Sequence, residues 1–285
     1  MRLFEKILCP IDFSEHSVKA LQWTEFLAKK YNSQVVIVHV TDFYPANAFI
    51  DLDYDSYHDG LSRTMKDFLE PLRIQYESML STGDPARKIV SLATGLGASL
   101  IVMGTAGLKG TAHKLLGSTT ESVVRNSTIP VLTISPETHA PAKFGSGQTL
   151  FPVARLDQPP RGYIRLRKMV RELQTHLSLI HVVEMKDPMF DSNFHASPFL
   201  MTTVETSEKK ELLARLGRKF SPQGVETILQ FGDAAAEILK EASSRDYDFL
   251  LLGARKGTFL TRFVESTVYK VISKSSIPAI TLRVA

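Results

Sequence analysis

The stretch GDPARKIVSLATGLGASLIVMG, residues 83–104, returns as GDAAAEILKEASSRDYDFLLLG, residues 232–253. The two stretches have equal length and start 149 residues apart (83 and 232). Each begins with Gly-Asp, continues with an amphipathic run and ends with a short apolar run closed by glycine. An amphipathic helix followed by an apolar strand explains this pattern. We therefore predict that the chain contains two copies of one fold.

The repeat extends in both directions from these stretches. Toward the N-terminus, VVIVHV and LSLIHVV align so that His39 and His181 correspond, at an offset of 142. Toward the C-terminus, STIPVLTI at 127–134 recurs as SSIPAITL at 275–282, at an offset of 148. The changing offset places an insertion and a one-residue deletion in loops of the second copy.

The copies meet in PETHAPAKFGSGQ, residues 136–148, where periodic apolar positions give way to Pro, Ala, Gly and Ser. We place the boundary near residue 142, which gives domains 1–141 and 142–285. A chain of 285 residues is long for one compact domain and suits two.

Within each copy, short unbroken apolar runs alternate with amphipathic stretches. Strands that are apolar on both faces and separated by helices indicate a parallel sheet covered on both sides. The predicted fold class is α/β, with two tandem doubly wound five-stranded parallel-sheet domains. Such sheets bind ligands beyond the carboxyl ends of their strands at the switch point, so we expect the site in the loops after the first and fourth strands.

Composition excludes several classes of protein. Hydrophobic residues make up 44% of the chain and charged residues 22%, which is typical of a folded soluble protein. The net charge is +4 without a run of five Lys or Arg, so nucleic-acid binding is not expected. The sequence has no secretory pattern and no stretch of 18 apolar residues, so we expect a cytoplasmic protein without a membrane segment. Cys9 is the only cysteine, and its apolar neighbours predict a buried side chain.

A glycine-rich segment follows the predicted fourth strand. Gly104, Gly107 and Gly117-Ser118 have the spacing Gly-x2-Gly-x9-Gly-Ser. Paired glycines let a backbone turn sharply and approach a ligand, and the free N–H groups at a helix start attract phosphate. Ser118 and Glu121 also have the spacing of a capping box. Capping alone would explain Ser118 but not the paired glycines.

This spacing, together with the opening PIDFSEHSVKAL, resembles the ATP-binding subclass of the universal stress protein family. The resemblance covers essentially the whole chain and implies a Rossmann-like fold of the adenine nucleotide alpha hydrolase type. It implies one ATP per chain, with or without Mg²⁺, in the first copy. The residues that match the family's nucleotide-binding positions are Pro10, Ile11, Asp12, Val40, Met103, Gly104, Thr105, Gly107, Gly117, Ser118 and Thr119.

Some of these residues have a second interpretation. Asp12 could instead cap the helix that begins near Ser14. Ala106 stands where many family members carry a polar or basic residue, so one phosphate contact is in doubt. His39 and His181 occupy equal strand positions, but neither lies at metal-ligand spacing from a carboxylate or second His, and structural packing is the favoured interpretation. We assign no catalytic or metal-binding residue.

The second copy lacks the matching residues. By the offsets above, Ala154 replaces Asp12, and Glu265 replaces Gly117. A carboxylate about 4 Å from a phosphate charge costs about 4 kcal/mol at an effective dielectric near 20. We therefore expect no ATP in the second copy. Its loop also carries Arg255, Lys256 and Arg262, for which a solvated basic loop is favoured over another anion site.

The resemblance implies an ATP-binding stress-response protein that acts through unidentified protein partners. No Walker-type Gly-Lys-Ser/Thr follows the loop, so a slow ATPase is the second hypothesis. A nucleotide-independent scaffold or chaperone-like protein is the third. Because family members commonly pair through their last strands, we expect residues 131–135 and 279–284 to join the copies as an internal pseudo-dimer. A further homodimer is left open.

Overall fold

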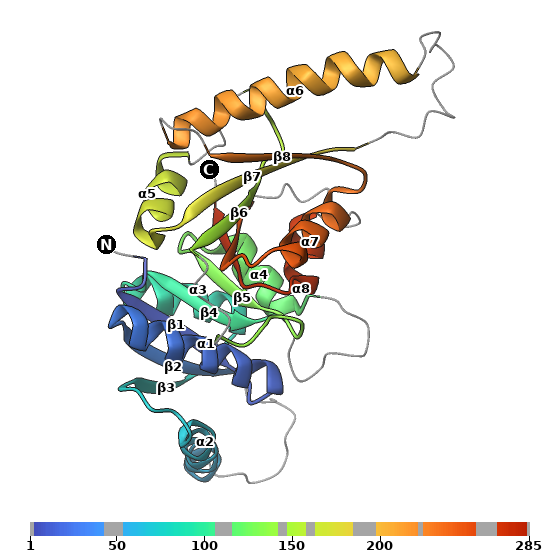
Figure 1. The fold of residues 1–285 in the computed structure, drawn as a ribbon. Coiled ribbons are helices and arrows are strands. Elements are labelled where there is room, and N and C mark those ends of the chain that lie inside the picture. Colours follow the sequence, from blue (N-terminus) through green and yellow to red (C-terminus); the bar gives the residue numbers. More distant parts are fainter. Residues whose placement is uncertain are drawn as a thin grey trace.

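A computed structural model gives the fold. It describes residues 3–42, 54–105, 116–141, 147–157, 163–184, 198–221, 225–254 and 267–283. In this part of the chain, the strands of both copies form one twisted sheet with helices on its two faces (Figure 1). The first copy is coloured blue to green and the second yellow to red.

Each copy contributes five strands and four helices to the described chain. The first copy has β1 (Lys6–Ile11), α1 (Glu15–Tyr31), β2 (Gln34–Thr41), α2 (Tyr54–Leu69), β3 (Glu77–Thr82), α3 (Pro85–Gly95), β4 (Leu100–Gly104), α4 (Ser118–Asn126) and β5 (Val131–Ile134). The second has β6 (Gln148–Pro152), α5 (Tyr163–Leu173), β7 (His176–Val183), α6 (Pro198–Phe220), β8 (Glu226–Phe231), α7 (Ala234–Ser244), β9 (Phe249–Ala254), α8 (Thr267–Lys274) and β10 (Ala279–Arg283).

The strand order is β3-β2-β1-β4-β5-β10-β9-β6-β7-β8. Within each copy neighbouring strands are parallel, and the first strand lies between the second and the fourth. The chain therefore reverses its winding direction between β1 and β4 and again between β6 and β9. This arrangement confirms the doubly wound α/β fold and places a switch point in each copy.

The Gly-Asp pairs that open the repeat have the same role in both copies. Gly83 and Gly232 have positive φ angles of 134° and 136°, which glycine adopts at little cost. Asp84 then caps α3 by accepting from Arg87 N, and Asp233 caps α7 by accepting from Ala236 N. A sharp turn followed by a side-chain cap thus starts the third helix of each copy.

The apolar runs are buried on both faces of the sheet. On one face, β-strand residues such as Ile7 and Phe151 pack with α1, α2, α5 and α6. On the other, residues such as Leu8 and Leu150 pack with α3, α4, α7 and α8. Because successive side chains of a strand point to opposite faces, a strand covered twice needs consecutive apolar residues.

The copies join edge to edge through antiparallel β5 and β10, with Leu132 paired to Ile280. On either side of this pair, Thr133 Oγ1 donates to Ala279 O and Thr281 Oγ1 donates to Val131 O, each at 3.1 Å. The offset of 148 relates these two hydrogen bonds to each other, so a pseudo-two-fold axis passes between Leu132 and Ile280. The expected pairing of the last strands is confirmed.

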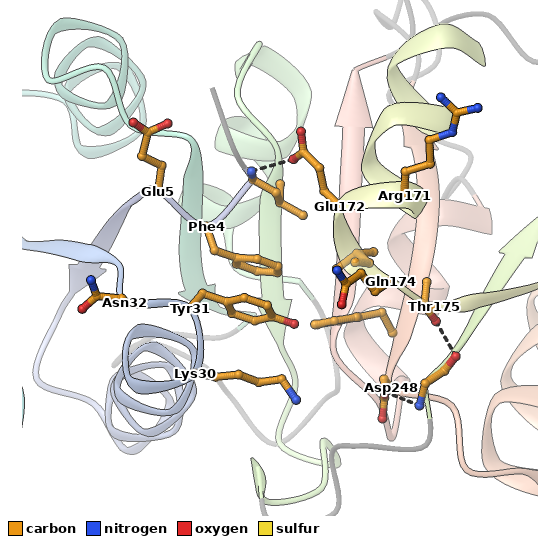
Figure 2. A pocket seen from close by; sticks show the side chains of 14 residues that line it. Phe4, Glu5, Lys30, Tyr31, Asn32, Arg171, Glu172, Gln174, Thr175 and Asp248 are labelled. Atoms are coloured by element: carbon orange, nitrogen blue, oxygen red, sulfur yellow. Dashed lines mark hydrogen bonds between the residues drawn. The ribbon is translucent and has the colours of Figure 1, made fainter.

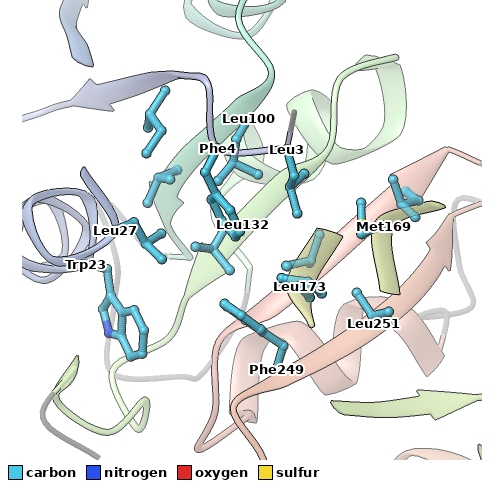
Figure 3. Close-up of a cluster of buried hydrophobic side chains, with 14 of the residues drawn as sticks. Leu3, Phe4, Trp23, Leu27, Leu100, Leu132, Met169, Leu173, Phe249 and Leu251 are labelled. Atoms are coloured by element: carbon cyan, nitrogen blue, oxygen red, sulfur yellow. The ribbon is translucent and has the colours of Figure 1, made fainter. Parts of the chain in front are cut away.

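Apolar side chains of both copies also meet beside this strand pair (Figure 3). The ring of Phe4 stacks on Tyr31 with centroids 4.2 Å apart and lies 6.4 Å from the ring of Phe249 in the second copy. Phe4 and Phe249 are 5% and 1% exposed. Burial of a Phe side chain contributes about 1.5–3 kcal/mol, so this cluster adds substantially to the strand pairing.

Candidate functional site

The segment after β1 is organised by the carboxylate of Asp12. Asp12 Oδ1 accepts from Ser14 N at 3.1 Å, from Ser14 Oγ at 2.5 Å and from Ser17 Oγ at 2.6 Å. Ser14 in turn caps α1 by accepting from Ser17 N. Asp12 is therefore not the cap of α1, as one interpretation of the sequence had it, but the residue that holds the cap in place.

Phe13 completes this turn in a left-handed conformation, with φ at 63°. Its ring packs 4.4 Å from the ring of His39 and edge-on to Phe68 at 5.3 Å. A bulky residue at positive φ is strained, and such strain is often held at ligand sites. The packing of Phe13 keeps the turn beyond β1 in one conformation.

His39 and His181 each form a hydrogen bond at the end of the first strand of their copy. His39 Nδ1 donates to Ile11 O at 2.8 Å, and His181 Nδ1 donates to Val153 O at 2.7 Å. Each hydrogen bond satisfies a carbonyl at the carboxyl end of the first strand of its copy. These contacts support the structural interpretation of both histidines.

The chain leaves β4 at Thr105 and returns at Gly117. Thr105 N donates to Ile134 O at 3.0 Å, and Thr105 O accepts from Gly117 N at 2.7 Å. Thr120, which is 4% exposed, donates its hydroxyl to Gly104 O at 2.8 Å. These contacts fix the first turn of α4 against the carboxyl end of β4.

The expected capping box at the start of α4 is absent. Gly117 occupies the N-cap without a side-chain hydrogen bond, and Ser118 is already the first helical residue. Glu121 forms an ion pair with Arg125 one turn later instead of reaching back. Within the described part of the chain, no acceptor pairs with the N–H groups of Ser118 or Thr119. The start of α4 therefore presents unpaired donors and the positive end of the helix dipole.

Gly104 is required because another helix packs closely against it, which the sequence did not predict. A Cβ on Gly104 would lie 2.9 Å from His16 Cβ and 3.0 Å from His16 O. The first turn of α1 thus packs directly on the end of β4, which brings the loops after β1 and β4 together. Ligand access, the expected reason, is not needed to explain this glycine. A close approach from 88 residues away in sequence (16 and 104) leaves no local signal.

The other expected site residues fall into three groups. The side chains of Pro10, Ile11, Met103 and Thr105 are buried, so their contacts with a ligand would use backbone atoms. Asp12, Val40, Gly104, Gly117 and Thr119 are partly exposed, and Ser118 is exposed. Gly107 lies outside the described residues, as does its neighbour Ala106.

The second copy has a different loop after its first strand. Ala154 is exposed at the position of Asp12, and Arg155 forms an exposed two-point ion pair with Asp157. Leu156 and Pro159 stand at the positions of Ser14 and Ser17, so the polar set around Asp12 has no counterpart. Val268 replaces Thr120 at the start of the last helix. Arg255, Lys256, Gly257, Arg262 and Glu265 lie outside the described residues.

A cavity of about 830 Å³ lies elsewhere, at the junction of the copies (Figure 2). Phe4, Lys30 and Tyr31 line one side, and Asp248 lies opposite. Asp248 accepts from Gly147 N at 2.8 Å. Burial and, secondarily, the charge of Asp248 raise the pKa of Tyr31 above its ordinary value. The walls mix acids, bases and aromatic rings without a convergent set, and we assign this cavity no ligand.

Neither a reactive cysteine nor a metal site is found among the described residues. Cys9 is 0% exposed, and burial raises the pKa of its thiol to about 12, which favours the unreactive thiol form. In the ranges that the structure describes, no group of three His, Cys, Asp or Glu side chains could hold a metal ion. No helix within those ranges is long and apolar enough to cross a membrane.

Both copies match known proteins of one family. The family model described as "Universal stress protein family" matches residues 3–135 and 150–283. A universal stress protein of Methanocaldococcus jannaschii is 31% identical over 143 residues, which are 46% of this chain and 82% of that protein. The universal stress protein YxiE of Bacillus subtilis is 32% identical over 147 residues, covering 46% of this chain and 99% of YxiE.

Similarity to solved structures extends over both copies together. The crystal structure of a universal stress protein from Archaeoglobus fulgidus aligns with a TM-score of 0.66 and 20% identity, covering 98% of each chain. At that identity the alignment supports the fold of the whole chain. The two family matches cover almost all of its length. The chain belongs to the universal stress protein family.

Proposed function

We propose that the first copy binds one ATP, with or without Mg²⁺, at the carboxyl ends of β1 and β4, and that its occupancy regulates interactions in the stress response. The observation that carries this proposal is the start of α4. In the described part of the chain the N–H groups of Ser118 and Thr119 have no acceptor, and the start of α4 lies at the same end of the sheet as the Asp12 turn. A helix start of this kind suits phosphate, because its donors and its dipole both favour an anion.

The turn after β1 supplies the other half of the proposed site. Asp12 is held by Ser14 and Ser17, so its backbone and carboxylate have a defined position beside the proposed adenosine site. Val40, at the end of the adjacent strand β2, is partly buried and would give the base an apolar contact. We assign no side chain a role in hydrolysis. The proposed function is therefore ATP binding and not ATP hydrolysis.

The second copy is proposed to bind no ATP. Ala154 cannot replace the carboxylate of Asp12, and Glu265 would bring a negative charge toward the phosphates. Its proposed role is to complete the pseudo-dimer, which the pairing of β5 with β10 supports.

Mass spectrometry of denatured, freshly purified protein tests the proposal, followed by calorimetric titration with ATP and with GTP as a control for the base. We expect adenine nucleotide in the denatured sample, or binding of added ATP but not GTP. Absence of nucleotide together with no heat of ATP binding would overturn the proposal and favour a nucleotide-independent scaffold. Steady-state phosphate release would instead identify an ATPase.

A further inference from the structure

Two arginines of the second copy hold the C-terminal end of α4 in the first copy. Arg165 Nη2, on α5, donates to Thr128 O at 2.6 Å. Arg283 Nη1, at the end of β10, donates to Asn126 O at 3.2 Å. Asn126 is the last residue of α4 and Thr128 lies two residues beyond it. Both guanidinium groups therefore lie at the carbonyl end of this helix.

This placement suits the electrostatics of a helix end. The last carbonyl groups of an α-helix lack intrahelical partners, and the negative end of the helix dipole favours cations. A third contact lies on the same side, where Arg125 Nε of α4 donates to Tyr269 Oη of α8 at 3.5 Å. The second copy thus contacts the end of α4 from α5, α8 and β10.

Pseudo-symmetry does not account for the arginine pair. The end of α8 in the second copy is contacted by short groups of the first copy, since Ser135 Oγ donates to Ser275 O at 2.5 Å and His139 N donates to Ser276 O at 2.8 Å. By the offsets of the repeat, Trp23 and Ser135 stand where Arg165 and Arg283 would be expected in the first copy. Among the described residues, the cationic contact is made toward the copy that carries the complete motif and has no counterpart at the end of α8.

The opposite end of α4 is the proposed phosphate-binding end. A helix of nine residues is about 13 Å long and behaves as one rigid element. Near its start, buried Thr120 anchors it to Gly104 O at 2.8 Å. With the helix fixed near one end, contacts at the other end determine the direction in which the N–H groups of Ser118 and Thr119 point.

We infer that Arg165 and Arg283 are positioning residues for the nucleotide site of the first copy. Through α4, the second copy holds the phosphate-binding N–H groups in the orientation that receives the anion. This inference rests on the proposed function and assigns the second copy a part in it. Binding is reciprocal, so ATP also strengthens the contact between the copies by the same factor.

Calorimetric titration of the full chain with ATP tests the inference. In the variant that combines Arg165→Ala with Arg283→Ala, we expect affinity to fall about tenfold, a size typical of coupling through a packed element. Lysine at both positions keeps a cationic donor and should restore most of the affinity. Arg218→Ala, at an exposed arginine of α6, is the matched control and should bind as the wild type does.

Melting temperatures without nucleotide separate positioning from loss of fold. We expect the alanine double variant to melt within a few degrees of the wild type, because single hydrogen bonds at an exposed helix end contribute little to the stability of the whole chain. Equal ATP affinity of wild type and double variant would overturn this inference while the proposed function stands. Loss of affinity in Arg218→Ala as well, or no recovery with lysine, would also overturn it. Failure of the wild type to bind ATP would remove the proposed function and this inference with it.

Discussion

The two copies share a scaffold but differ in the turn beyond the first strand. In the first copy, one carboxylate oxygen of Asp12 gathers Ser14 and Ser17, and Phe13 adopts a strained left-handed conformation. In the second, Ala154 and Arg155 stand at the positions of Asp12 and Phe13, and Arg155 forms an exposed ion pair with Asp157. The sheet, the strand order and the capped third helix are unchanged. The two copies therefore share their fold, while the residues of the proposed site occur in the first copy.

The two copies also differ where they contact each other. There the second copy supplies two arginines that have no counterpart at the matching positions of the first copy. Its arginines reach the end of α4, whereas short hydroxyl and backbone groups serve the end of α8. In the proposed account, the second copy therefore contributes to the site of the first without binding ATP itself.

The largest effect is expected when charges are placed on the shared strand pair. Leu132→Asp combined with Ile280→Asp would bury two facing carboxylates, because both side chains are 0% exposed and paired across β5 and β10. A buried, unpaired charge costs several kcal/mol. We expect the copies to separate and protease cleavage between residues 136 and 148 to accelerate, as followed by limited proteolysis and small-angle scattering.

Val18→Asp is the control for this experiment, since Val18 is 41% exposed on α1 and a charge there should change little. Wild-type copies that already tumble independently in scattering would contradict the proposed internal pseudo-dimer.

The next-largest effect is expected when Gly117 is replaced by glutamate, the residue that the second copy carries at the matching position. Gly117 has φ −60° and ψ 140°, a conformation open to any L-residue, so Gly117→Glu should fold. The carboxylate would oppose phosphate by about 4 kcal/mol, or about a thousandfold in affinity. We expect ATP binding to disappear in calorimetry. Gly117→Gln, of nearly equal size but uncharged, should lose less, and equal affinity of Gly117→Glu and wild type would mean that phosphate binds elsewhere.

A smaller effect concerns a polar network found in the second copy. Tyr247 Oη donates to Glu241 Oε1 at 2.9 Å, and both residues are buried. Their counterparts in the first copy are Ala98 and Leu92, which are apolar. Tyr247→Phe removes the donor and leaves Glu241 with the ion pair to Arg245 at 3.2 Å. We expect a loss of about 1–3 kcal/mol in the free energy of unfolding, measured with urea.

The pH dependence of stability checks the same residue. Burial raises the pKa of Tyr247 from 10 to about 12, so the folded state holds the proton more tightly than the unfolded state. The contribution of Tyr247 is therefore complete below pH 10 and declines as pH rises toward 12. Tyr247→Phe should remove this decline. An alkaline decline that persists unchanged in the variant would assign it to other groups.

Sequence predicted the fold closely because it rests on periodic apolar residues and on the repeat. The offsets of 142 and 148 correspond to real matches, since His39 and His181 make the same contact and Thr133 and Thr281 are related by the pseudo-two-fold axis. The pairing of the last strands of the two copies was also predicted, from the family resemblance, and the structure shows that β5 and β10 pair in antiparallel direction.

Local spacing was a weaker guide within the site. Ser118 and Glu121 have the spacing of a capping box, yet Gly117 is the N-cap and Glu121 pairs with Arg125 on the same helix. The contact of His16 with Gly104 and the reach of Arg283 to Asn126 depend on tertiary packing. No short-range pattern encodes contacts between residues 88 and 157 positions apart (16 and 104, 126 and 283).

We propose that one copy binds ATP and that the other does not. Calorimetric titration of the full chain to saturation, after removal of any nucleotide carried through purification, tests it most directly. We predict one ATP per chain, with the single binding event absent in Gly117→Glu. Two equivalent sites per chain, or one site that survives in Gly117→Glu, would contradict the account.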